Sequence, residues 1–491
     1  MRLLIWLIPV ALSAADVSPK TYLADVQYLA SPELKGRATG SPEIEKAAHY
    51  IESQFKSFGL KPPDGKNYEQ AFPVAIGAHL GPGNHMHYSE PGEKEASLAP
   101  VRDFIPFSFS SNGKLEAPVV FAGYGITDKA KRYDDYAGID VTGKIVLVLR
   151  HEPNEGQTPS QQASFTEKAV NAKMHGARGV ILINDFAAHP GKVDEVEKFA
   201  HIEGPSDAGV FFVQVRVAVA WNWFQAEGRD LQKIASDMNH SEKPNSFALA
   251  KLKVTLDVDV KHDTAMAHNV AAYLPGETPE YVVVGAHYDH LGLGGEFSLA
   301  PSQTGTIHPG ADDNASGTAG VIELARWFSR QPKQKRGILF LTFAGEELGL
   351  FGSEWYVNHP ILPLENAVAM INMDMIGRIR EGKVYLSGTG TGSTFAKLIE
   401  QIKVPPSLHI DLAEKAGYGS SDHTSFTTKQ VPVLFFFSGL HGDYHKPSDT
   451  ADKIDAADAA TLLDYVADVL LSLENTSERP QFIHVAEPSQ P

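Results

Sequence analysis

Residues 281–290 read YVVVGAHYDH, so an apolar run ends directly on ionisable side chains. Two later apolar runs also end on ionisable side chains, ILFLTFAGEE from Ile338 and AVAMINMD from Ala367. A third run, VPVLFFF from Val431, is followed by a loop that contains His445. Short apolar runs of this kind are typical of strands that are buried on both faces of a parallel sheet. Helical spacing follows in 318–330, 393–402 and 459–473. The sequence therefore predicts an α/β fold with a mostly parallel sheet flanked by helices.

Residues that can bind metal stand at or just beyond the carboxyl end of each predicted strand. They are His287 and Asp289, then Glu346 and Glu347, then Asp374, and finally His445. In open α/β sheets, ligands bind outside the carboxyl ends of the strands. We therefore expect these side chains to meet at one edge of the sheet.

The donor types indicate which metal this edge would bind. The chain has no cysteine, so thiolate ligands and disulfides are excluded. Histidine with carboxylates favours zinc, or manganese or cobalt as substitutes, over calcium. Two ions about 3.5–4 Å apart, bridged by a carboxylate and a water, would use all the donors and produce a bridging hydroxide for hydrolysis.

Several of these positions allow two interpretations from the residues alone. Asp289 is two residues from His287 in an extended segment, so it can orient that imidazole. Asp312 and Asp313, in GADDNASG, either cap a helix or supply a bridging carboxylate. Of Glu346 and Glu347, one can bind metal while the other acts as general base.

The remaining candidate site residues are Asp374, Arg378 and two residues of the segment GDYHKPSDT, Tyr444 and His445. A carboxylate in the apolar stretch INMDMIG needs a metal or a cationic partner. His445 is either a ligand or a surface-loop residue. Tyr444 either donates a hydrogen bond to a developing oxyanion or packs. Arg378 either binds a substrate carboxylate or forms an ordinary ion pair.

Five motifs taken in order, AHYDH, GADDNASG, AGEELGLFGS, NMDMIG and DYHKPSDT, resemble the M28 family of metallopeptidases. The resemblance implies two zinc ions and an aminopeptidase that releases N-terminal residues from peptides. It implies His287 and Asp374 on separate metals, Asp313 as the bridge, Glu347 and His445 completing the shells, and Glu346 as base. It also implies a cis peptide after Asp313, and a substrate pocket lined by GYGSSDHTSF from Gly417.

The residue composition and the hydrophobic pattern change along the chain, and these changes suggest five segments. The first, 1–15, has one Arg, an apolar run and small residues, as in a signal peptide. We expect an N-terminal part of the peptidase domain at 16–116 and a catalytic domain at 261–473. The β-rich segment 117–260 resembles an inserted protease-associated domain, and 474–491 reads as a polar tail.

The net charge and the N-terminal segment limit which binding partners and which cellular compartment are expected. A net charge of −17 spread along the chain argues against nucleic acid and anionic membranes as partners. The leader predicts export, secreted or periplasmic in a bacterium, with no membrane attachment after cleavage.

Other functions remain to be weighed against an aminopeptidase. They are an M28-type carboxypeptidase or dipeptidase, a single-zinc glutaminyl cyclase, and a receptor-like binding ectodomain without metal chemistry. A serine hydrolase is excluded because no G-x-S-x-G element occurs.

Overall fold

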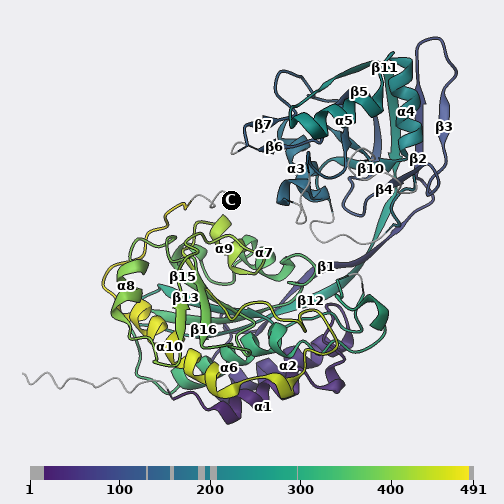
Figure 1. Ribbon diagram of the computed structural model, residues 1–491. Coiled ribbons are helices and arrows are strands. Elements are labelled where there is room, and N and C mark those ends of the chain that lie inside the picture. Colours follow the sequence, from purple (N-terminus) through teal and green to yellow (C-terminus); the bar gives the residue numbers. More distant parts are fainter. Residues whose placement is uncertain are drawn as a thin grey trace, which may run out of the picture. The chain divides into compact units, whose positions relative to one another are not determined.

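The computed structural model describes residues 16–128, 131–154, 160–185, 194–199, 207–295 and 297–485. The predicted signal peptide at 1–15 lies outside these residues. The chain forms two units, one of residues 1–74 and 265–491 and the other of residues 75–264 (Figure 1). Within the described residues, no helix is both long and apolar enough to cross a membrane.

The larger unit is built around an eight-stranded sheet. Its order is β1-β12-β14-β13-β15-β18-β16-β17, and the central four strands run parallel. The strands are β1 (Glu69–Leu80), β12 (Val260–Leu274), β13 (Tyr281–His287), β14 (Gly337–Phe343), β15 (Ala367–Asp374), β16 (Lys383–Ser387), β17 (His409–Asp411) and β18 (Val433–Phe437).

Helices cover both faces of this sheet, which confirms the predicted α/β class. The helices are α1 (Pro19–Leu29), α2 (Pro42–Ser57), α6 (Gly317–Phe328), α7 (Phe351–Asn358), α8 (Phe395–Gln401), α9 (His423–Thr428) and α10 (Ala456–Asn475). In Figure 1, α1, α2, α6 and α10 lie on one side of the sheet and α7 and α9 on the other.

Alternation along the strands explains this two-sided packing. Val282 and Val284 of β13 join the core beneath α1, α2, α6 and α10, whereas Val283 joins the core with Tyr356 of α7 and Phe426 of α9. Successive strand residues point to opposite faces, so a continuous apolar run is needed when both faces are covered. The unbroken runs seen in the sequence therefore have a direct structural cause.

The smaller unit has its own mixed eight-stranded sheet and its own cores. The strands of this sheet are β2 (His85–Ser89), β3 (Ala96–Leu98), β4 (Phe104–Pro106), β5 (Gly113–Phe121), β8 (Ile145–Leu149), β9 (Gly179–Ile183), β10 (Phe211–Val215) and β11 (Phe247–Val258). A separate two-stranded sheet consists of β6 (Thr127–Asp128) and β7 (Tyr133–Asp134). Its helices are α3 (Phe165–Met174), α4 (Val217–Ala226) and α5 (Leu231–Ser241).

Two segments differ from the boundaries expected from the sequence. Residues 75–116 lie with the smaller unit, because β2 pairs with β11 and β4 pairs with β10 of its sheet. The segment expected to be a polar tail contacts the larger unit within its described part, residues 474–485. Arg479 donates to Glu280 and to the Glu365 carbonyl, and Phe482 forms a bridge with Gly392.

Candidate metal centre

The candidate metal centre lies at the carboxyl edge of the large sheet. His287 and Asp374 are the last residues of the neighbouring parallel strands β13 and β15. Glu346 and Glu347 follow β14, and His445 lies in the loop after β18. The structure thus brings together the side chains that the sequence placed at separate strand ends.

The first group of donors surrounds His287, which is almost fully buried. Its Nε2 atom lies 3.4 Å from Asp313 Oδ1 and 3.4 Å from Asp374 Oδ1. Glu346 Oε2 lies 3.7 Å from the same nitrogen. Burial alone would lower the pKa of His287, but Glu346 and Asp374 raise it above its ordinary value.

The second group of donors surrounds His445. Its Nε2 atom lies 3.2 Å from Asp313 Oδ2 and 3.0 Å from Glu347 Oε2. Although burial opposes protonation, Glu347 and Asp313 raise the pKa of His445 to about 11. Asp313 therefore points one carboxylate oxygen toward each histidine.

The grouping of the donor atoms differs in one respect from the two ligand sets that the family resemblance implies. We expected His287 and Asp374 on separate metals, but their donor atoms lie 3.4 Å apart and fall in one group with Asp313. The reason is that β13 and β15 are hydrogen-bonded neighbours, so their last residues lie side by side. One ion could bind His287, Asp313 and Asp374 together.

A third histidine, His290, belongs to the centre but was not singled out from the sequence. It is fully buried, and its Nδ1 atom lies 2.5 Å from Glu347 Oε1 and 3.9 Å from Asp313 Oδ2. Its Nε2 atom has no hydrogen-bond partner among the described residues. The only signal was its place in AHYDH, directly after Asp289.

Asp289 lies beside His287, as expected, and also contacts two other groups. Its Oδ1 atom lies 3.6 Å from Nδ1 of His287, which is longer than a hydrogen bond. Its carboxylate accepts hydrogen bonds from the Thr39 hydroxyl at 2.8 Å and from the Glu346 backbone N–H at 3.2 Å. Asp289 thus connects the β13 loop to the N-terminal segment and to the Glu346 turn.

Glu346 has an environment suited to a proton acceptor. Burial, together with the carboxylates of Asp374 and Glu347, holds the pKa of Glu346 well above its ordinary value. By contrast, although burial and Asp313 oppose ionisation, His290 and His445 lower the pKa of Glu347 to about 2. Adjacent glutamates whose pKa values differ in this way can divide the roles of base and ligand.

The loop that carries Asp313 is held by a second acidic residue. Asp449 accepts hydrogen bonds from the backbone N–H groups of Asp312 and Asp313. Asp312 instead accepts from the Gly377 N–H and lies 3.1 Å from Nε2 of His441. The peptide bond between Asp313 and Asn314 is cis, as the resemblance implies.

The other site residues predicted from the sequence lie next to the candidate metal centre or near it. The Tyr444 ring stacks on His445, with centroids 3.9 Å apart. Arg378 donates to Asp443 at 2.7 Å, so it forms an ion pair within the chain. From the segment that begins at Gly417, Ser421 donates to Asp374 at 2.8 Å.

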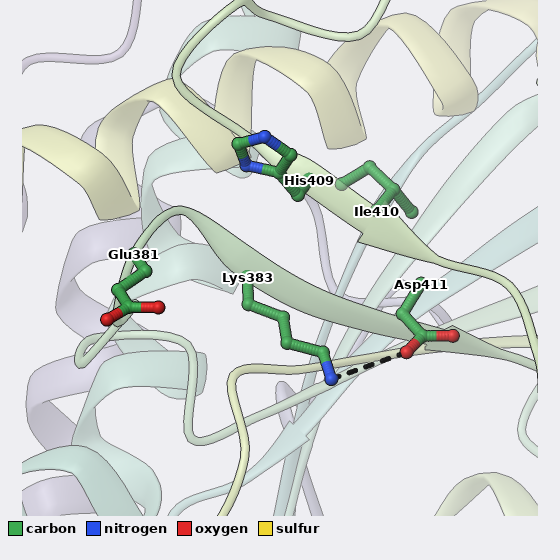
Figure 2. A pocket seen from close by; sticks show the side chains of 5 residues that line it. All are labelled: Glu381, Lys383, His409, Ile410 and Asp411. Carbon is green, nitrogen blue, oxygen red and sulfur yellow. Dashed lines mark ion pairs between the residues drawn. The ribbon is translucent and has the colours of Figure 1, made fainter.

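A separate hollow lies along the β16–β17 edge of the large sheet (Figure 2). It is lined by Glu381, Lys383, His409, Ile410 and Asp411, with Lys383 paired to Asp411 at 3.5 Å. Within the described part of the chain, all three residue groups with the spacing of metal ligands lie at the candidate metal centre and none at this hollow.

The donor set of the candidate centre fits a metal. Among the described residues, neither Asp313 Oδ2 nor Asp374 Oδ1 accepts a hydrogen bond of good geometry, and both atoms are buried. Several carboxylates buried close together repel one another, and a divalent cation would compensate their charge. Imidazole and carboxylate donors without thiolates match zinc.

The fold and this centre define an α/β protein of the metal-dependent hydrolase class. Residues 269–470 match the model of peptidase family M28, and residues 115–220 match that of the PA domain. The chain therefore contains a region that matches peptidase family M28, which is a family of peptidases, and a second region that matches the PA domain.

Relatives with known names agree with this assignment. "Aminopeptidase YwaD" of Bacillus subtilis is 26% identical over 392 residues, which cover 75% of this chain and 70% of that protein. "Probable leucine aminopeptidase 1" of Trichophyton verrucosum is 31% identical over 214 residues, which cover 40% of this chain and 55% of that protein. The chain thus spans about half the length of this fungal relative.

Solved structures share the fold along nearly the whole chain. The "Aminopeptidase from Aneurinibacillus sp. strain AM-1" aligns with a TM-score of 0.53 and 24% identity, covering 97% of both chains. "BSAP, a zinc aminopeptidase from Bacillus subtilis" aligns with a TM-score of 0.50 and 21% identity, covering 96% of this chain and 99% of that chain.

Proposed function

We propose that the chain is an exported aminopeptidase that uses two zinc ions. One ion would bind His287, Asp313 and Asp374, and the other Asp313, Glu347 and His445. The observation that carries this proposal is the orientation of Asp313, whose two oxygens lie 3.4 Å and 3.2 Å from the two histidines. A carboxylate placed in this way can bridge two ions.

The residues of the chain then have distinct tasks. Zinc, when bound, supplies Lewis acidity toward a carbonyl and toward water. Glu346 accepts the proton of the attacking water and passes it to the amine that leaves, since its carboxylate faces His287 and belongs to neither proposed ligand set. Tyr444, stacked on His445, donates its hydroxyl proton in a hydrogen bond to the carbonyl oxygen as negative charge develops there. Asp289 positions the Glu346 turn through the backbone N–H of Glu346.

The substrate class is supported by the names of the relatives. A Bacillus aminopeptidase and fungal leucine aminopeptidases are among the relatives that the chain resembles. We therefore propose peptides with a free N-terminus as substrates, with the N-terminal residue released. Export is supported by the leader-like residues 1–15. We propose that the mature protein functions outside the cytoplasm of a bacterium.

The first test is metal analysis of the purified protein combined with an activity panel. We expect about two zinc ions per chain, and hydrolysis of aminoacyl-arylamides that stops on chelation and returns with zinc. N-blocked dipeptides and N-terminal glutaminyl peptides serve as matched substrates. Activity only on the blocked dipeptides would indicate a carboxypeptidase or dipeptidase. One zinc with release of ammonia from glutaminyl peptides would indicate a cyclase.

A further inference from the structure

A short N-terminal segment, Gly36–Thr39, packs directly against the loops of the candidate metal centre. Gly36 has a φ of +74°, and a Cβ atom there would lie 2.3 Å from the His308 carbonyl oxygen and 2.5 Å from that of Gly292. The backbone N–H of Gly292 donates to the Gly36 carbonyl at 3.0 Å. Only glycine fits such a close backbone approach.

Arg37 in this segment is fully buried, and its guanidinium group donates to four backbone carbonyls. Nε donates to Tyr288 at 2.7 Å, Nη2 donates to Gly310 at 2.9 Å, and Nη1 donates to Pro309 at 2.5 Å and to Leu29 at 2.9 Å. Leu29 is the last residue of α1, where the helix dipole favours a cation.

Three of these carbonyls, those of Tyr288, Pro309 and Gly310, belong to the two loops that carry the ligands. Tyr288 lies between His287 and Asp289, and Gly310 lies three residues before Asp313. A planar guanidinium with five N–H donors can hold both loops at a fixed separation. Arg37 is therefore placed to fix His287 relative to the carboxylate that faces both histidines.

Thr39 makes the corresponding link to the general base. Its hydroxyl donates to Asp289 Oδ2 at 2.8 Å and accepts from the backbone N–H of Gly345 at 3.1 Å. The other oxygen of Asp289 accepts from the Glu346 N–H. Thr39 and Asp289 together hold the turn on which Glu346 and Glu347 lie.

We propose that Arg37 and Thr39 are positioning residues that set the spacing of the metal ligands. This inference rests on the proposed two-zinc site. The charge of Arg37 allows positioning to be separated from electrostatics. A buried cation near the centre repels zinc, so electrostatics alone would make zinc bind more tightly when the charge is removed. A positioning role requires the opposite result.

The test measures zinc binding to the metal-free, full-length protein by competition with a chromogenic chelator. We expect Arg37→Met and Thr39→Val to weaken zinc binding about 10- to 100-fold, as is typical when residues that orient metal ligands are removed. Arg37→Lys keeps the charge but has fewer donors in a different geometry, so we expect an intermediate loss.

Arg336→Met provides a matched control. Arg336 is also buried and donates to the carbonyls of Leu473 and Thr476, but it lies outside the candidate metal centre. We expect this variant to lower the melting temperature of the metal-free protein without changing its affinity for zinc. An equal loss of zinc affinity in Arg336→Met would show a general effect of destabilisation and would overturn the inference.

The remaining outcomes separate the inference from the proposed function. Wild-type protein that binds no zinc would overturn both. Two zinc ions in the wild type with unchanged or tighter binding in Arg37→Met and Thr39→Val would overturn the positioning role alone. Should Arg37→Met fail to fold, Arg37→Lys and Thr39→Val decide by the same criterion.

Discussion

At the scale of single residues, the centre depends on carboxylates that have different partners although they lie close together. Asp313 faces two histidines, Glu347 lies between His290 and His445, and Glu346 faces His287 at a longer distance. Burial is the main cause that raises the pKa of Glu346. Although burial also acts on Glu347, His290 and His445 lower the pKa of Glu347 to about 2. The two adjacent residues of the same type therefore have different surroundings, Glu347 between two histidines and Glu346 farther from His287.

Substitution of Glu346 tests this division of tasks. We expect Glu346→Gln to retain both zinc ions and to lose turnover by about 10²- to 10⁴-fold, because the amide cannot accept the proton of the attacking water. Metal analysis and the kcat for an aminoacyl-arylamide measure the two effects. Full activity in Glu346→Gln would show that another group is the base.

Asp313→Ala is the companion variant. Removing the carboxylate that faces both histidines takes a ligand from each proposed site. We expect zinc content to fall well below two ions per chain, with activity lost in parallel. Retention of two ions would contradict the bridging role.

At the scale of helices and strands, the sequence was informative where elements are long and apolar. The strands that begin near Tyr281, Ile338 and Ala367 could be predicted because each strand is buried on both faces and is therefore continuously apolar. The residues at or just after their carboxyl ends were then recognised as candidate metal ligands. Short elements such as α9, with six residues, have too little periodicity. Arg37 could not be found because it bonds a carbonyl 251 positions away. The strands β2 to β4 could not be assigned to the smaller unit from the sequence, because they are short and β2 and β4 pair with strands far downstream.

Helix α10 has an acidic residue whose titration should affect stability. Burial raises the pKa of Glu474, near the end of α10, from 4.5 to about 9. Between these values the folded protein keeps a proton that the unfolded chain has released, so folding stability falls as pH rises. The slope is at most about 1.4 kcal/mol per pH unit.

The variant Glu474→Gln removes this titration. We expect its melting temperature to exceed that of the wild type by a margin that is small at pH 5 and grows toward pH 9. Thermal unfolding at pH 5, 7 and 9 measures the margin. A margin that does not change with pH would show that Glu474 ionises normally in the folded state.

At the scale of the whole molecule, the chain has two units with separate cores. All of the candidate ligands belong to the larger unit. Zinc should therefore stabilise one unit and leave the other unaffected. Ligand at 1,000 times its dissociation constant stabilises a folded unit by about 4 kcal/mol, which corresponds to a shift of roughly 10 °C for a unit of this size.

Calorimetry with and without a chelator tests this expectation. We expect two unfolding transitions, of which chelation lowers only one, by roughly 10 °C. The Asp313→Ala variant should show the lowered transition without any chelator. A single transition that the chelator lowers as a whole would instead indicate that the two units unfold together.

The chain passes from one unit to the other within β1 and returns within β12. These two strands are neighbours in the large sheet, at the edge opposite β17. The ends of the insertion therefore start from adjacent positions on one scaffold. A different insert could be exchanged at these two points without altering any residue of the metal centre, which makes the large unit a natural recipient for modular engineering.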